Sequence, residues 1–125
     1  MTIREFHAWQ WSDYQAKHRN RVNLAIHIVA VPLFMLGCAV VAFGLVRLAP
    51  MRIVAGLVAM IVSVVLEGIG HRLEAEQPAP FTGFPDFLKR FFVEQWVTFP
   101  RFVLSGRFFQ NLTGRGPRSG RAGDP

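Results

Sequence analysis

Three polar residues near the end of an apolar stretch have a spacing that suits metal binding. Glu67, His71 and Glu74 stand at positions i, i+4 and i+7. At about 100° per residue they would share one face of an α-helix. A histidine between two carboxylates can ligate a metal while its neighbours hold it in orientation. The alternative is a structural pair, in which Glu67 and His71 only lock two segments together.

Two earlier histidines add to this pattern. His27 lies four residues into the first apolar run, and Asn23 precedes it by about one helical turn. A single histidine in such a run is more often a hydrogen-bonded interior group than a ligand. His18 stands nine residues before His27, on the opposite face of an unbroken helix. The two can meet only if the chain bends between Asn20 and Asn23. We expect His7, which lacks this context, to be exposed.

Two apolar runs must position these side chains. Leu24 to Val46 contains 23 residues without one Asp, Glu, Lys or Arg, which is long enough to cross a bilayer. Ile53 to Leu66 contains 14 uncharged residues, and it reaches a spanning length of about 18 only if Glu67 lies at membrane depth, paired or protonated. The sequence therefore predicts an all-α fold built on a membrane helical hairpin, with transmembrane helices at about 24–46 and 53–70.

A soluble helical domain is the alternative to this hairpin. It would have to bury the apolar residues of 40–45 on every helix face, which a domain with two or three helices can hardly do.

The distribution of positive charge predicts the orientation of the hairpin. Four Lys/Arg precede residue 24, eight follow residue 70, and the connecting turn carries only Arg47 and Arg52. The positive-inside rule then places both termini in the cytoplasm, in a bacterial inner membrane or, in a eukaryote, the endoplasmic reticulum. The net charge of +6 suits an anionic lipid surface better than nucleic acid.

The flanking segments predict amphipathic helices at both ends of the hairpin. Thr2 and Glu5 have capping-box spacing at the start of an N-terminal helix. Residues 86–98 carry aromatic groups on one face and mostly charged groups, including Glu94, on the other, which is typical of an interfacial helix that ends at Pro100. We expect one membrane domain over residues 1–112 and a disordered basic tail over 113–125.

The order and spacing of several residues resemble a known family, the 2-hydroxy fatty acid dioxygenases. The likeness covers about residues 14–108 and is to short bacterial-type relatives of the fungal 2-hydroxypalmitate dioxygenase. The matching positions are Tyr14-x3-His18-x4-Asn23-x3-His27-x4-Pro32, Gly70-His71 and Glu74-x3-Pro78-Ala79.

The resemblance implies an Fe(II)-dependent membrane enzyme of fatty-acid α-oxidation, which uses O2 to shorten a 2-hydroxy fatty acid by one carbon. His18, His27 and His71 match the histidines essential in the family, so they are the expected catalytic residues. With Glu74, at the acidic position before Pro-Ala, they are also the expected metal ligands. Asn23 and Glu67 are expected to support them.

The sequence departs from the family pattern at one point and leaves alternatives open. His71 and Glu74 are three residues apart, one fewer than usual in the family, so Glu67 or Glu76 could take the place of Glu74. An alternative function is a non-catalytic membrane protein that binds lipid or a partner through its aromatic, basic C-terminal helix.

Overall fold

The computed structural model describes residues 1–116, and all regular structure in that range is helical, as predicted. The helices are α1 (Ile3–Ser12), α2 (Arg21–Val46), α3 (Pro50–Arg72), α4 (Phe84–Val93), the π-helical turn η1 (Glu94–Thr98), α5 (Phe99–Leu104) and α6 (Arg107–Leu112). Residues 113–116 form a turn after α6. Most of the tail predicted to be disordered, residues 117–125, lies outside the described residues.

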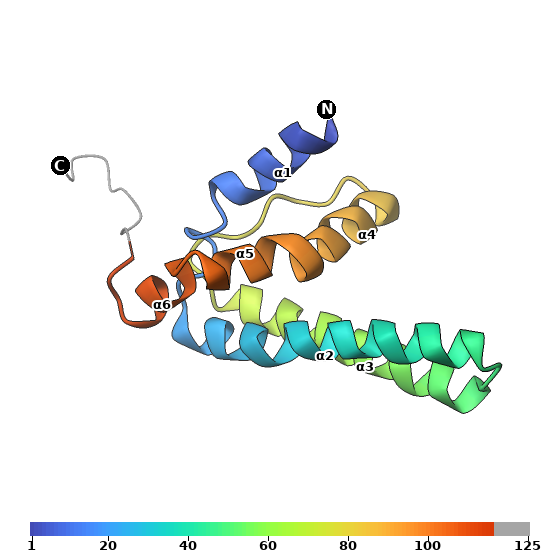
Figure 1. Cartoon of the computed structure of the whole chain (residues 1–125). Helices are drawn as coiled ribbons and strands as arrows, with labels where there is room; N and C mark the ends of the chain where they lie inside the picture. The colour runs from blue at the N-terminus through green and yellow to red at the C-terminus, as the bar shows by residue number, and fades with distance from the viewer. Residues whose placement is uncertain (117–125) are drawn as a thin grey trace.

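The two long helices α2 and α3 pack side by side as an antiparallel hairpin (Figure 1). Helix α2 begins where Asn20 caps it, because the Asn20 side chain accepts hydrogen bonds from the amides of Val22 and Asn23. Helix α3 begins at Pro50, three residues before the predicted start. Proline suits a first helical position because the amide it lacks would have no partner there.

Glycines allow the two helices to approach closely. A Cβ atom built on Gly56 would lie 2.7 Å from the carbonyl oxygen of Gly37 and 2.6 Å from Cγ2 of Val41. Small residues at such a crossing are the usual means of close packing between membrane helices.

Gly56→Leu should therefore destabilise the protein by about 1–3 kcal/mol or more, because the new side chain must push the helices apart. Thermal unfolding in detergent would measure the loss. Gly68→Leu is the matched control in the same helix, since a Cβ there meets nothing within 4 Å among residues 1–116. Equal stability of the two variants would contradict the close crossing.

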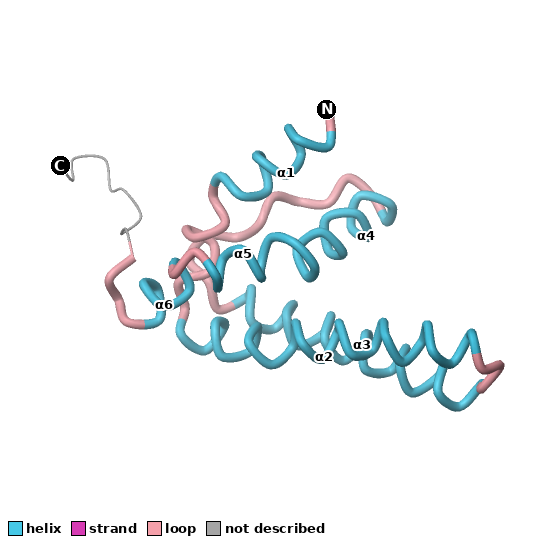
Figure 2. Tube along the Cα trace, in the orientation of Figure 1, coloured by secondary structure: helices cyan, strands magenta, loops and turns pink. Residues whose placement is uncertain are grey.

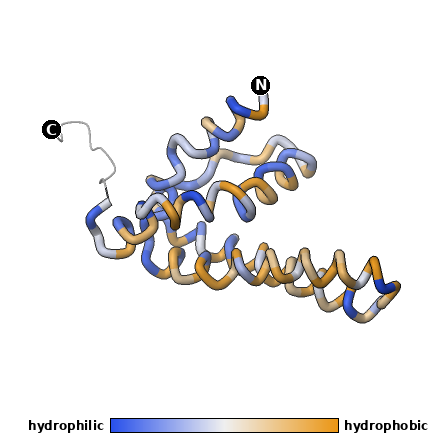
Figure 3. The backbone as a smooth tube through the Cα atoms, viewed as in Figure 1, coloured by the Kyte–Doolittle hydropathy of each residue, from blue (hydrophilic) through white to orange (hydrophobic). Residues whose placement is uncertain are grey.

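The outer surface of the hairpin is apolar (Figure 3). Only 28% of the most apolar window of α2 and 22% of that of α3 is buried inside the protein. Large side chains such as Leu36, Phe43, Val58 and Ile61 are exposed instead. Both helices are long and apolar enough to cross a membrane. A soluble core helix would be mostly covered, so this surface favours contact with lipid.

A second layer covers the open end of the hairpin, where its two helices do not join. Helices α4, η1 and α5 form one run over α2 and α3, with α1 on the far side of that run (Figure 1). Phe34 of α2 makes edge-to-face contacts with Phe91 and Phe92 of α4, at 5.1 Å between ring centroids in each case. Part of the aromatic face of α4 is therefore used to cover the hairpin.

The helical run does not end at Pro100, where the sequence predicts its end. The amide of Phe99 donates to the carbonyl of Glu94, five residues back, which closes a π-helical turn immediately before the proline. Pro100 then occupies one of the first two positions of α5, where its missing amide costs no helical hydrogen bond. The π turn has a second consequence, because it contains two side chains of the site described next.

Candidate metal centre

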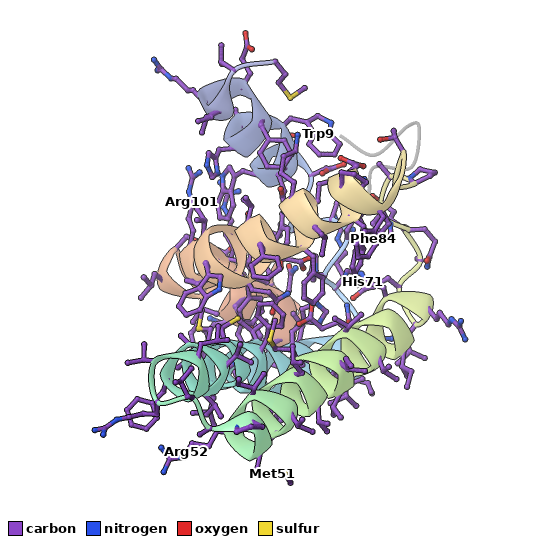
Figure 4. The ribbon with its side chains drawn as sticks, turned by 90° about the vertical axis from the view of Figure 1, so that its right-hand side faces the viewer. Trp9, Met51, Arg52, His71, Phe84 and Arg101 are labelled. Carbon is purple, nitrogen blue, oxygen red and sulfur yellow. The ribbon has the colours of Figure 1, made fainter. Side chains whose placement is uncertain are left out.

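Four side chains from four different segments converge at the open end of the hairpin. His18 comes from the bend between α1 and α2, His27 from α2, His71 from the last turn of α3, and Glu94 from the start of η1. One ligand atom from each lies within 4.8 Å of those from all the others. Figure 4 shows His71 in the space between α3 and α4. The chain breaks at Asn20 as predicted, and this break brings His18 and His27 together.

The three imidazole rings form a nearly equilateral triangle. Their centroids are 4.9 Å apart for His18 and His27, 4.8 Å for His18 and His71, and 5.0 Å for His27 and His71. Each pair of rings is close to perpendicular. Glu94 Oε1 lies 3.4, 3.6 and 3.9 Å from Nε2 of His18, His27 and His71, in that order.

Backbone carbonyls fix the orientation of two of the rings. His18 Nδ1 lies 2.7 Å from the carbonyl oxygen of Tyr14, and His27 Nδ1 lies 3.0 Å from that of Asn23. A carbonyl can only accept, so each Nδ1 carries a proton, and in the neutral ring each Nε2 keeps a lone pair. Among residues 1–116, both Nε2 atoms are buried without a hydrogen-bond partner. This is the arrangement that metal-binding histidines adopt.

Electrostatics keep Glu94 anionic. Burial alone would raise the pKa of Glu94, but protonated imidazole nitrogens of His18, His27 and His71 facing the carboxylate lower this pKa well below its usual value, and those protons must leave when a metal ion binds. Burial lowers the pKa of His18 to about 4, against the opposing influence of Glu94. A deprotonated carboxylate beside a neutral imidazole is the state that binds metal ions.

Tyr14 holds the carboxylate of Glu94 in place. Its hydroxyl donates to Glu94 Oε1 at 2.9 Å, and its ring stacks on His18 at a centroid distance of 3.8 Å. Burial raises the pKa of Tyr14 well above its usual value, and the neighbouring Glu94 adds to this rise. The hydroxyl therefore stays protonated and remains a donor.

The distances within the cluster fit a shared metal better than direct hydrogen bonds. Separations of 3.4–3.9 Å between the imidazole nitrogens and Glu94 are long for a hydrogen bond. Ligand atoms at about 2.0–2.2 Å from one metal ion lie about 3.0–3.6 Å apart when they are neighbours around it. The three histidines and Glu94 therefore make a donor set that fits a metal ion after small shifts.

The two residues expected to support the ligands lie beside the cluster. The carbonyl of Asn23 orients His27, as described above. Glu67 Oε2 lies 3.7 Å from His27 Nε2 and accepts a hydrogen bond of 2.8 Å from Gln95 Nε2. The sequence suggests His71 as the partner of Glu67, but the contacts are with Gln95 and His27. Gln95, the second side chain of the π turn at the site, was not anticipated.

Glu74 has different partners from those expected of a ligand. Its carboxylate accepts hydrogen bonds from the amides of Arg19 and Asn20 at 3.0 and 2.9 Å, and from Asn23 Nδ2 at 2.8 Å. It thus ties the bend that carries His18 to the end of α3. Glu94 takes the fourth place in the cluster.

The sequence pattern does not identify Glu94 as a site residue, because it predicts Glu94 on the charged, solvent-facing side of an interfacial helix. Its side chain is in fact only 15% exposed. Pro100 within a helical pattern is the available signal, since a proline there either ends the helix or is accommodated by an irregular turn before it.

Glu74→Gln should lower stability by about 2–3 kcal/mol but leave the metal affinity within a few-fold. Each carboxylate oxygen of Glu74 accepts a hydrogen bond from a backbone amide, of Arg19 or of Asn20. The NH2 group of glutamine would face one of these amides as a second donor, so that hydrogen bond would be lost. Thermal unfolding in detergent and a metal titration would measure the two effects. Loss of metal binding without loss of stability would contradict the structural role.

A cavity of about 260 Å³ adjoins the cluster and is lined in part by His18, His71 and Glu94. Its walls come from α1, the bend after it, α3, α4 and the loop between α3 and α4, which runs beside α1 (Figure 2). Arg90 holds this loop by donating to the carbonyls of Ala79 and Pro80. The remaining lining is largely aromatic or aliphatic.

Over residues 1–116, the fold and the site define a helical hairpin protein with a cluster of three histidines and one glutamate, two of them buried and two partly buried, beside a largely apolar cavity. Residues 3–103 match the family described as 2-hydroxy-palmitic acid dioxygenase Mpo1-like, and the chain belongs to this family. The resemblance seen in the sequence is thereby confirmed. No curated protein and no solved structure gives a significant match.

Proposed function

We propose that the protein is an integral membrane, Fe(II)-dependent dioxygenase that acts on 2-hydroxy fatty acids. The observation that carries this proposal is the cluster of His18, His27, His71 and Glu94, in which two imidazole nitrogens are buried without a hydrogen-bond partner in the described part of the chain. Membership of a family described by a 2-hydroxy-palmitic acid dioxygenase supports the substrate and the reaction.

Iron is the metal that this proposal names. Imidazole and carboxylate ligands suit Fe(II), and four protein ligands leave positions open for other molecules. When bound, Fe(II) would supply the one-electron chemistry that O2 requires. The ligand set that we propose is His18, His27, His71 and Glu94, with Glu74 outside it.

The chain itself supplies binding and orientation. The aromatic lining of the cavity, including Trp9, Phe87 and Phe91, is suited to apolar carbon next to the cluster. The Tyr14 hydroxyl holds Glu94, and the carbonyls of Tyr14 and Asn23 hold two imidazoles. Burial of these groups limits the access of water to the site.

The exposed apolar surface of α2 and α3 supports insertion into a bilayer. A hairpin with two spans leaves both termini on one side, and the excess of Lys/Arg outside the turn favours the cytoplasm. The candidate site then lies near the cytoplasmic surface. A reporter fused after residue 116 should read as cytoplasmic, and one inserted between Arg47 and Pro50 should not.

The function is tested with detergent-purified protein loaded anaerobically with Fe(II). We expect about one iron per chain and, after addition of 2-hydroxypalmitate and O2, the acid one carbon shorter. Palmitate, which lacks the hydroxyl group, and protein loaded with Zn(II), which is redox-inactive, are the controls and should give no product. Protein that takes up no iron, or that oxidises palmitate equally well, would contradict the proposal.

A further inference from the structure

The glycines of α3 differ in what surrounds them. A Cβ atom on Gly56 would strike α2, and one on Gly70 would strike the side chain of Asn23. These two positions are glycine because a neighbour occupies the space. Gly68 has no such neighbour within residues 1–116, since a Cβ there would meet nothing within 4 Å. Glycine inside a helix costs about 1 kcal/mol relative to alanine, and packing does not account for it here.

Gly68 lies where the cavity meets the lipid-facing surface of α3. It lines the cavity together with Val64, four residues before it, and His71, three residues after it. With these spacings all three residues lie on the same face of α3. Val65 and Ile69, on the adjoining face, are 55% and 48% exposed and do not line the cavity. Gly68 is itself exposed. It therefore stands on the border between the cavity and the exposed apolar surface of the span.

The cavity follows α3 from the metal cluster toward the middle of the span. Val64 and His71 are separated by about 10 Å along the helix axis. The volume of about 260 Å³ is slightly below the range of roughly 300–1,000 Å³ typical of ligand pockets. It can hold a head group and the first part of an acyl chain, but the rest of a long chain must leave through an apolar opening.

We propose that Gly68 forms this opening: the acyl chain of the substrate passes over Gly68 between the cavity and the lipid, and the absence of a side chain at position 68 permits long chains. The inference rests on the proposed function for the identity of the head group. The occupant is a single unbranched acyl chain, because the exposed apolar side chains of Val65 and Ile69 adjoin the opening.

The test compares Gly68→Ala, Gly68→Leu and Gly68→Phe with Val65→Phe, which adds the same ring to the neighbouring lipid-facing position. Each protein is purified in detergent and loaded with Fe(II) without O2. Binding of 2-hydroxypalmitate and of the short acid 2-hydroxybutyrate is then measured by calorimetry. Iron content and thermal unfolding show whether each variant keeps its site and its fold.

We expect the affinity for 2-hydroxypalmitate to fall in the order Ala, Leu, Phe at position 68, by about tenfold or more for Phe, because several methylene groups lose their apolar contacts. The affinity for 2-hydroxybutyrate should change less than about twofold. Val65→Phe should bind both acids like the unaltered protein. Long-chain binding that is insensitive to residue 68, or an equal loss for both acids, would overturn the proposal.

The same experiment separates this inference from the proposed function. In one outcome, the unaltered protein takes up iron and shortens 2-hydroxy acids while substitutions at position 68 leave the affinity for 2-hydroxypalmitate unchanged. That result contradicts the proposed opening and supports the proposed enzyme function. If the protein takes up no iron, binding of palmitate is measured instead. If palmitate affinity then depends on residue 68, the acyl-chain opening is supported and the dioxygenase function is contradicted. If palmitate affinity does not depend on residue 68, both proposals are contradicted.

Discussion

Glutamine in place of Glu94 is expected to abolish tight metal binding while the helical hairpin stays folded. The change keeps the shape of the side chain but removes the only anionic ligand of the cluster, whose Oε1 faces all three imidazoles. Loss of a group that merely supports a ligand typically costs 10–100-fold in metal affinity, so loss of this ligand should cost more than about 100-fold. Anaerobic titration against a coloured chelator would measure it, and turnover should be lost as well.

Two neighbouring glutamates provide controls for this prediction. Glu76→Gln changes a partly buried carboxylate outside the cluster and should leave affinity and stability unchanged. Glu74→Gln should mainly lower stability, for the reasons given above. If Glu74→Gln lost the metal and Glu94→Gln kept it, the ligand set implied by the family resemblance would be right and the one proposed from the geometry wrong.

Alanine in place of His27 is expected to remove the stabilisation that metal gives the protein. His27 is fully buried, and its Nε2 has no hydrogen-bond partner among the residues that the structure describes. A ligand present at about 100 times its dissociation constant stabilises the folded state by about 2.7 kcal/mol. Thermal unfolding with and without Fe(II) should show this difference for the unaltered protein and essentially none for His27→Ala.

Imidazole and a fourth histidine distinguish a lost ligand from a damaged core. His27→Ala leaves a void of the shape of the missing ring, so added imidazole should partly restore iron binding if the ring acts as a ligand. His7→Ala removes a histidine that lies outside the cluster and should retain full metal-dependent stabilisation. Restoration of stability without restoration of iron binding would favour a purely structural role for His27.

The hairpin could be predicted from the sequence because its signal is local. An uncharged run from Leu24 to Val46 leaves few alternatives to a spanning helix. The sequence predicts the start of α3 three residues late, because the uncharged run begins only after Arg52. Helix formation depends on the backbone, and Pro50 is already suited to the first turn. The long side chain of Arg52 leaves the apolar surface by lying over the ring of Phe43, at 5.0 Å from the centroid.

The candidate site was only half visible in the sequence. His18 and His27 could be brought together in advance because an asparagine between them is a natural helix cap. The alignment of Glu74 with His71 failed because α3 ends at Arg72, so the helical face does not extend to Glu74. Glu94 comes from a segment distant in sequence, and a π turn rather than a regular helix carries it. Residue spacing predicts neither the contact of Glu94 with histidines from other helices nor the π turn that positions it.

The distribution of the four cluster residues along the chain sets an order for the biogenesis of the protein. His18 and His27 leave the ribosome first, His71 completes the hairpin, and Glu94 follows only after the loop between α3 and α4. Asn111 in α6, beyond the family match, is later still and donates to the carbonyl of His18 at 2.7 Å. The hairpin can therefore enter the bilayer before its metal site is complete. A metal held by all four residues would therefore bind only after residue 94 has been made and the hairpin has formed.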